Sequence, residues 1–478
     1  MLMNGNGMDG SAAQIRPRLF GTNGVRGIFG KELTPELVID LSYSLATYFG
    51  KGRIVVGYDG RKSSPVISRL VRSAFNSAGL DVADAGLVPT PCLQFAAKRL
   101  GYAGGVMVTA SHNPPEYNGI KPIAHDGVEI PREDELLVED IFYSKRFARI
   151  DGNGSQFAED NAIPSYIDAA ISLVDAEKIR SRKLTVVMDA GNGAQAVLAP
   201  LLAERLGCRA IVINGQVDGD FPARGSEPTL DNLHALSAAV REAGADFGVA
   251  YDGDGDRSIF CDEKGEIYWG DKTGTLLVDH LLKTMDSNGG SSSGGTAKEV
   301  VCPINTSMML SIVAERAGAK LVYTKVGSVE VSREMVRRGS KIGLEENGGF
   351  MYGRLNEVRD GAMATALVLD MLASTASGQK LSDLFSSLPK TFQYKAKFKC
   401  PTREVANTVV SRCMEHGSPK RVETMDGAKI WLDSETWVMV RPSGTEPLVR
   451  MYAESTERQL LDSKVQEYQR LIQETISG

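Results

Sequence analysis

Hydrophobic and polar residues follow a repeated order along this chain, in which short apolar runs alternate with longer amphipathic segments. The run RIVVGY, which begins at Arg53, is typical of a buried strand. The segment SPVISRLVRSAFNSAG that follows has apolar residues at helical spacing and ends at Gly79, which is a common way for a helix to stop. The same order recurs in LTVVMDAGNGAQAVLAPLLAERLG and in VVCPINTSMMLSIVAERAG. The apolar face of the first predicted helix consists of Val66, Ile67, Leu70, Val71 and Phe75.

Apolar strands that alternate with amphipathic helices favour parallel sheets with helices on both faces. The three repeats therefore predict three related α/β domains with mixed, parallel-rich sheets. Near the end, TWVMVRPSGTEPLVRMYAES alternates as an antiparallel hairpin does, which predicts a smaller C-terminal α+β domain. The last predicted helix presents one apolar face, formed by Leu461, Val465, Tyr468 and Ile472. We expect four domains around a central cleft, with the bounds 1–163, 164–266, 267–386 and 387–478.

Composition narrows the class of protein. The chain has 478 residues and a formal net charge of −6, which argues against broad binding of nucleic acid. Its six cysteines form no CxxC pair, so neither a disulfide framework nor a zinc site is indicated. No apolar run is long enough for a signal peptide or a membrane span. We expect a cytoplasmic protein with no membrane partner.

The first polar loop, TASHNPPEYNGIK, follows the apolar run GGVMV. Serine, asparagine and proline are common in turns, so an ordinary turn is one interpretation. The other makes Ser111 a nucleophile or a carrier of phosphate, with Lys121 as a nearby cation or proton donor. Because side chains of consecutive residues usually diverge, we do not expect His112 to act as the base of a Ser–His pair. Ser111 does not lie in a GxSxG pattern, which excludes the usual hydrolase turn.

The second loop is YDGDGDR, in which Asp252, Asp254 and Asp256 alternate with glycines. Three carboxylates at this spacing can converge on one small, hard cation such as Mg²⁺ or Ca²⁺. An EF-hand would need glycine at its sixth position, where this chain has Arg257, and it would need flanking helices instead of strands. Carboxylates that only cap a turn would repel one another. The loop therefore predicts a metal site that is not an EF-hand.

Two further loops carry polar groups suited to a phosphorylated sugar. GLEENGG places Glu345, Glu346 and Asn347 between glycines, where they can bind sugar hydroxyls, although a solvated turn explains them equally well. RPSGTEP combines an arginine, two hydroxyls and exposed backbone amides, which favours a phosphate site over a plain hairpin turn. The predicted phosphate site consists of Arg441, Ser443, Gly444 and Thr445.

Taken together, these loops resemble the α-D-phosphohexomutase superfamily, and the resemblance begins at FGTNGVRG near Phe20. The start and the EENGG and RDGAM segments are similar to phosphoglucosamine mutases and related archaeal-type hexose-phosphate mutases. The resemblance implies that Ser111 carries a phosphoryl group, next to His112, Lys121 and Arg26. It also implies one Mg²⁺ held by Ser111 and the three aspartates. The implied substrate-binding residues are Arg257, Glu345, Asn347, Arg441, Ser443, Gly444 and Thr445.

The resemblance implies an enzyme that converts a hexose 6-phosphate into the 1-phosphate through a bisphosphorylated sugar, with glucosamine 6-phosphate as the first candidate. Phosphomannomutase or phosphoglucomutase activity remains an alternative, as does a phosphosugar-binding protein that has lost catalysis. Many bacterial relatives have GEQSGH or GEMSGH where this chain has LEENGG, so Asn347 stands in place of the serine and Gly349 in place of the histidine. A proton-transfer role for that histidine does not carry over. A homo-oligomer is also possible.

Overall fold

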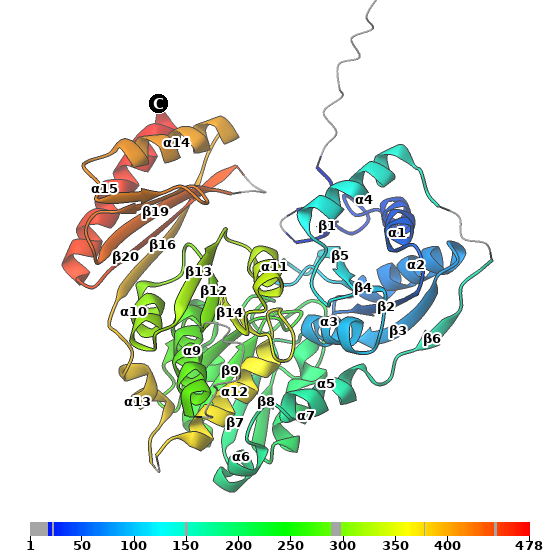
Figure 1. Cartoon of the computed structure of the whole chain (residues 1–478), viewed down its shortest axis with the longest axis horizontal. Coiled ribbons are helices and arrows are strands. Elements are labelled where there is room, and N and C mark those ends of the chain that lie inside the picture. The colour runs from blue at the N-terminus through cyan, green and yellow to red at the C-terminus, as the bar shows by residue number, and fades with distance from the viewer. Residues whose placement is uncertain (1–17, 22, 149–151, 288–297, 377, 444–446) are drawn as a thin grey trace, which may run out of the picture.

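The structure is a computed structural model that describes residues 18–21, 23–148, 152–287, 298–376, 378–443 and 447–478. It contains four β-sheets in succession along the chain (Figure 1). The first has the strand order β1-β5-β4-β2-β3-β6, the second β11-β10-β9-β7-β8 and the third β13-β12-β14-β15. The fourth sheet, β16-β20-β19-β18-β17, is antiparallel throughout. The predicted architecture of three related α/β units and a smaller α+β unit is therefore confirmed.

The strands of the first two sheets and the helices that accompany them lie in the first part of the chain, in the following order. Those up to β6 are β1 (Val25–Ile28), α1 (Pro35–Phe49), β2 (Arg53–Tyr58), α2 (Ser64–Ser77), β3 (Asp81–Leu87), α3 (Thr90–Arg99), β4 (Gly104–Val108), β5 (Tyr117–Ala124), α4 (Arg132–Ser144) and β6 (Gln156–Ala158). Those up to β11 are α5 (Ala162–Ile171), α6 (Ala176–Arg182), β7 (Thr185–Asp189), η1 (Ala194–Val197), α7 (Ala199–Arg205), β8 (Arg209–Ile213), η2 (Leu230–Asn232), α8 (His234–Ala243), β9 (Phe247–Tyr251), β10 (Ser258–Asp262) and β11 (Ile267–Tyr268).

The remaining elements build the third and fourth sheets. Those of the third are α9 (Gly270–Ser287), β12 (Glu299–Pro303), α10 (Met308–Arg316), β13 (Lys320–Thr324), α11 (Ser328–Arg338), β14 (Ile342–Leu344), β15 (Phe350–Tyr352), α12 (Gly361–Ser374) and α13 (Leu381–Ser386). Those of the fourth are β16 (Phe392–Lys399), α14 (Arg403–Glu415), β17 (Arg421–Glu423), β18 (Ala428–Trp431), β19 (Thr436–Pro442), β20 (Leu448–Ser455) and α15 (Arg458–Ser477).

The first three sheets share one topological unit. In each, three parallel strands are joined by helical connections, and the third strand then turns back into an antiparallel neighbour. The returning pairs are β4–β5, β9–β10 and β14–β15, and their loops are residues 109–116, 252–257 and 345–349. The three polar loops singled out in the sequence thus occupy equivalent positions in three related units. The fourth, at residues 443–447, joins the antiparallel pair β19–β20.

Local sequence explains most of these elements. Helix α1 begins after Thr34, whose side chain accepts a hydrogen bond from the Leu37 amide, as an N-cap does. Helix α15 buries all four residues of its predicted apolar face. Helix α2 departs from prediction at one position: Val66 is exposed to 40%, whereas the next residue, Ile67, is fully buried. The buried stripe is therefore narrower than the sequence pattern suggests.

Most of the hydrophobic core lies in the first three units or within the fourth, and a smaller buried cluster joins the third unit to the fourth. One continuous cluster crosses the first three units and includes Phe95, Tyr166, Phe247 and Leu344, whereas the fourth unit has a core of its own. Figure 1 shows the fourth unit packed beside the third and away from the first. At that junction the buried Glu454 of β20 accepts a hydrogen bond of 2.8 Å from the Met308 amide, at the start of α10. None of the described helices has the length and hydrophobicity to cross a membrane.

Candidate active site

Ser111 lies in the β4–β5 loop, is fully buried and has a positive backbone angle, with φ of 50°. Few residues other than glycine adopt this conformation without support from their surroundings. The support comes from Arg61, whose guanidinium donates to the carbonyl oxygens of Ser111 and Asn113 at 2.7 Å and of Pro114 at 2.6 Å. Asp59 in turn accepts from Arg61 Nε at 3.1 Å. The serine loop is therefore held by a buried cation through its backbone.

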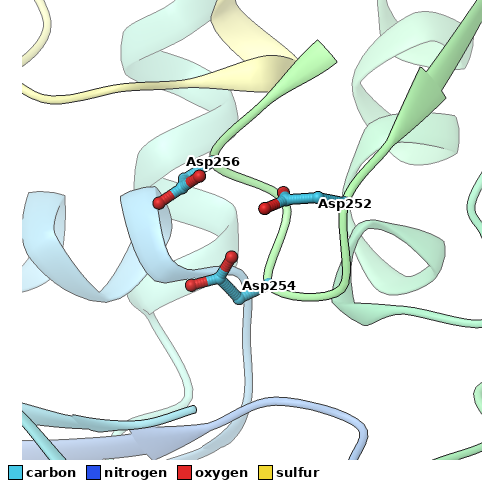
Figure 2. Close-up of side chains that lie close together, drawn as sticks. All are labelled: Asp252, Asp254 and Asp256. Carbon is cyan, nitrogen blue, oxygen red and sulfur yellow. The ribbon is translucent and has the colours of Figure 1, made fainter. Parts of the chain in front are cut away.

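The three aspartates of the β9–β10 loop converge, and one oxygen of each lies within 4.8 Å of the others. Figure 2 shows their carboxylates gathered around a common centre. The glycines between them have separate roles. Gly253 packs against the Ser111 carbonyl oxygen, which would lie 2.7 Å from an added Cβ atom, and Gly255 has a φ of 76°. Glycine is therefore needed at both positions to bring the two loops together.

Each aspartate has a defined set of partners. Ser111 Oγ donates to Asp252 Oδ2 at 2.9 Å. Thr90 Oγ1 and Lys121 Nζ donate to Asp254 Oδ2 at 2.7 and 2.9 Å. The other oxygens of Asp254 and Asp256, both Oδ1, are buried and have no hydrogen-bond partner among the described residues. Buried carboxylate oxygens without partners are costly, and a hard cation such as Mg²⁺ would satisfy them. The residues present therefore fit the predicted metal site.

The pKa values of neighbouring groups in the site shift in opposite directions. Burial, together with the charges of Asp256 and Asp254, raises the pKa of Asp252 well above its usual value. Burial acts in the same direction on Asp254, but the contact with Lys121 outweighs it and lowers the pKa of Asp254 overall. Burial also lowers the pKa of Arg26 to about 10. Arg26 lies against the serine loop, where its Nη1 donates to Asn113 Oδ1 at 2.8 Å.

His112 does not diverge from Ser111, and in this respect the sequence-based expectation was wrong. His112 Nδ1 lies 3.3 Å from Ser111 Oγ, because the positive φ of Ser111 brings the two side chains together. The same nitrogen lies 3.1 Å from Arg257 Nη2. The charge of Arg257, followed by burial, lowers the pKa of His112 far below its usual value. His112 Nδ1 therefore accepts from Arg257, and the lowered pKa makes His112 a poor general base.

The β14–β15 loop approaches the metal triad through an arginine that precedes α12. Arg359 donates to Asp256 Oδ2 at 2.5 Å and to Glu345 Oε2 at 3.2 Å. Asn347 Oδ1 accepts from the Gly349 amide at 3.3 Å, within the loop. Burial raises the pKa of Glu345. Glu345 is thus linked to the triad, whereas the contact of Asn347 is local.

The predicted phosphate site lies in another part of the molecule. Arg441 and Ser443 lie at the end of β19, in the fourth unit, and Figure 1 shows that this unit is separated from the first. Arg441 Nε pairs with Asp426 Oδ2 at 3.1 Å, and the Ser443 amide donates to the Leu448 carbonyl. Gly444 and Thr445 lie outside the described residues. The structure therefore brings the β4–β5, β9–β10 and β14–β15 loops together, and it places Arg441 on a separate unit.

Comparison with known proteins matches all four units to one family. Models of phosphoglucomutase/phosphomannomutase α/β/α domains I, II and III match residues 17–149, 164–265 and 269–392, and the C-terminal domain matches residues 405–469. The chain belongs to the phosphoglucomutase/phosphomannomutase family.

Relatives within this family are similar over nearly their whole length. A phosphoglucosamine/phosphogalactosamine mutase of Sulfurisphaera tokodaii is 40% identical over 95% of this chain and 99% of its own. A phosphoglucomutase/phosphomannomutase of Thermococcus kodakarensis is 39% identical over 96% of this chain and 100% of its own. The solved structure of a phosphoglucomutase/phosphomannomutase family protein from Burkholderia thailandensis is 25% identical, has a TM-score of 0.84 and covers 96% of this chain and 97% of its own. The resemblance inferred from the sequence is confirmed.

Sequence reasoning missed three residues of this family member's site. Arg61, Thr90 and Arg359 all bind the serine loop or the triad, although 50 to 164 residues separate them from their partners. Arg61 belongs to YDGRKSS, a polar turn directly after a strand, and Arg359 belongs to RDGAM. Polar residues at the end of a strand or at the start of a helix often belong to a site, so both segments could have been used to predict these two arginines as site residues. Thr90 left no comparable signal, since a threonine that begins a helix is common.

Proposed function

We propose that the protein interconverts hexose 6-phosphate and hexose 1-phosphate, with a phosphoserine at Ser111 and a bisphosphorylated sugar as intermediate. The observation that carries this proposal is the hydrogen bond from the Ser111 hydroxyl to Asp252, within a triad that leaves two buried oxygens without partners. In the unphosphorylated protein this hydrogen bond holds Ser111 Oγ beside the carboxylates that would bind the cation, which is where a phosphate carrier would need to lie. Relatives named phosphoglucosamine/phosphogalactosamine mutase and phosphoglucomutase/phosphomannomutase support the same reaction.

In the first half-reaction the bond between phosphorus and Ser111 Oγ breaks and a bond from phosphorus to a sugar hydroxyl oxygen forms, and in the net step the proton of that hydroxyl ends on Ser111 Oγ. The second half-reaction returns the phosphoryl group at the other sugar position to Ser111. Lys121 and Arg26 place positive charge beside the serine loop and would offset the charge of the transferring group. Asp252, Asp254 and Asp256 would hold one Mg²⁺, which supplies further positive charge when it is bound.

Substrate contacts divide among three loops. Glu345 and Asn347 would bind sugar hydroxyls, and Arg257, which projects next to His112, would contact the substrate near the serine. Arg441 and Ser443, together with Gly444 and Thr445, would hold the phosphate that does not react. Because the sugar must turn over between the two transfers, we assign residues 387–478 to a domain that changes its position. This unit has a core of its own, which supports that assignment, and it shares only a small buried cluster with the third unit. The other domains would be 1–163, 164–266 and 267–386.

We propose glucosamine 6-phosphate as the preferred substrate, because the relative from Sulfurisphaera tokodaii is named for glucosamine and galactosamine phosphates. Activity on mannose or glucose phosphates is the alternative, favoured by the name of the relative from Thermococcus kodakarensis. A binding protein without catalysis would not need the Ser111–Asp252 hydrogen bond. We place the enzyme in the cytoplasm, since its six cysteines are all free.

The test compares the wild-type protein with Ser111→Ala and with Ser77→Ala, which changes an exposed serine on α2. Each protein receives glucosamine, mannose and glucose 6-phosphates in turn, with Mg²⁺ and a trace of the matching bisphosphate. We expect isomerisation without release of inorganic phosphate, and one phosphate on the intact wild-type and Ser77→Ala proteins. Ser111→Ala should carry no phosphate and should be inactive. Full activity of Ser111→Ala would refute the proposal, and release of phosphate would indicate a phosphatase.

A further inference from the structure

Arg359 lies between the metal triad and the sugar loop. It precedes α12 and is exposed to only 6%. Its Nη2 donates a hydrogen bond to Asp256, and its Nη1 donates one to Glu345. Two carboxylates from different units therefore share one buried guanidinium. The planar fork of arginine suits such a bridge, whereas a lysine ammonium has no fixed geometry. Arg359 consequently fixes the position of Glu345 relative to Asp256.

The space that Arg359 occupies is the space into which a side chain at position 349 would project. A Cβ atom added to Gly349 would lie 2.4 Å from Arg359 Cδ and 2.8 Å from Arg359 Cγ. Distances this short are well inside van der Waals contact, so one of the two groups would have to move. Arg359 cannot move at low cost, because both ends of its guanidinium are hydrogen-bonded in a buried site. A side chain at position 349 and Arg359 in this conformation therefore exclude each other.

We propose that Arg359 is a positioning residue, and that it and Gly349 form a matched pair, in which the absence of a side chain at position 349 makes room for Arg359. This inference rests on the proposed function. Because Arg359 binds Asp256 Oδ2, the other oxygen, Asp256 Oδ1, has no hydrogen bond among the described residues and is free to bind a cation, although Arg257 Nε lies 3.9 Å away. By binding Glu345, Arg359 aligns the sugar loop with the reacting centre. Arginine stays protonated at neutral pH, so Arg359 acts through charge and geometry and not as a general acid or base.

The first test measures mutual exclusion by stability, without activity. Melting temperatures are compared for wild type, Gly349→Ala, Arg359→Ala and the double variant. Gly349→Ala should lower the melting temperature clearly in the wild-type background and much less when Arg359 is already alanine. Such non-additivity is expected for groups in contact. Equal effects of Gly349→Ala in both backgrounds would overturn the steric part of the proposal, whether or not the protein is a mutase.

The second test measures positioning. Arg359→Met should reduce kcat/KM for the preferred hexose phosphate by about 10²-fold, the order of loss expected when a binding group is misplaced. Its KM should rise, since Glu345 loses its anchor, and Arg359→Lys should recover part of the loss. Gly349→His should lose much more activity in the wild-type background than in Arg359→Ala, whose own activity sets the upper limit for the double variant. A merely structural role predicts lower melting temperatures with unchanged KM, and that result would overturn the proposal. If the wild type isomerises no hexose phosphate, the proposed function fails instead, and the stability cycle still decides the pairing.

Discussion

The guanidinium of Arg61 donates to the backbone carbonyl of Ser111 at 2.7 Å, so a buried cation binds the peptide group of the proposed phosphate carrier and not its hydroxyl. The hydroxyl remains directed to Asp252. A non-glycine residue with positive φ costs about 1–3 kcal/mol when its surroundings enforce it. The hydrogen bonds from Arg61 to three carbonyls of this loop and to that of Tyr117, the first residue of β5, offset that cost. The backbone of Ser111 is thus held by the cationic Arg61, and its side chain is held by the carboxyl group of Asp252.

Arg61→Lys should therefore impair the serine without removing the positive charge. A lysine cannot donate to four carbonyls in a fixed fork, so the loop should relax and Ser111 Oγ should leave Asp252. We expect a loss of about 10²-fold in kcat/KM and incomplete phosphorylation of Ser111 by intact-mass analysis. Arg69→Lys, an exposed change on α2, is the control. Wild-type kinetics in Arg61→Lys would show that the loop holds its shape by other means.

Asp252→Asn should distinguish the effect of the triad on folding stability from its role in binding Mg²⁺. Three buried carboxylates repel one another when no cation is bound, so removal of one charge should not lower the melting temperature in a chelator. Mg²⁺ should raise the melting temperature of the wild type, because it binds only the folded state, and this increase should largely disappear in the variant. Turnover should fall with it. Asp231→Asn, an exposed change, should keep the full increase. An unchanged Mg²⁺ effect in Asp252→Asn would exclude the triad as the cation site.

The limits of sequence reading are visible in particular residues. The triad was predicted because its three members lie within five positions and share one loop, so local geometry alone brings them together. Arg359 reaches Asp256 across 103 residues, and this contact depends on how the second and third units pack. His112 shows a different limit. The expectation of divergent neighbours holds for ordinary backbone, and only the positive φ of Ser111 reverses it. Topology followed from periodicity, whereas the partners of each charge required the packing of the units.

Asp360 should make stability depend on pH. Its Oδ1 accepts from the Met363 amide at 3.0 Å and from the Tyr166 hydroxyl at 2.6 Å, and burial raises its pKa to about 7. The folded protein thus keeps a proton that the unfolded chain loses near pH 3.8. The resulting stability is complete below pH 3.8 and is lost as pH rises through about 7. Asp360→Asn keeps a capping oxygen but cannot ionise, so its melting temperature relative to wild type should rise between pH 4.5 and 8. A constant difference over this range would contradict the assignment.

The last prediction concerns Glu346, which joins the sugar loop to the fourth unit. Glu346 Oε2 accepts from Trp269 Nε1 at 2.7 Å and pairs with Lys395 of β16. The Lys395 side chain retains about a third of its exposure, so solvent screens the pair, and we expect a coupling energy of only about 1 kcal/mol. The pair nevertheless lies where the fourth unit meets a loop that would bind the sugar. Breaking it should therefore change substrate affinity more than stability.

Glu346→Gln and Lys395→Met should each change KM for the 6-phosphate and the 1-phosphate in the same direction, and the double variant should resemble either single one. This pattern is expected because both changes remove one shared contact. The reversed pair, Glu346→Lys with Lys395→Glu, should recover part of the wild-type KM at low salt and less at high salt, since screening weakens it. Lys397→Met provides the matched control, because Lys397 lies two residues further along β16 on the same face of the strand. Strictly additive effects on KM, with no recovery in the reversed pair, would mean that the ion pair does not link the fourth unit to the sugar loop.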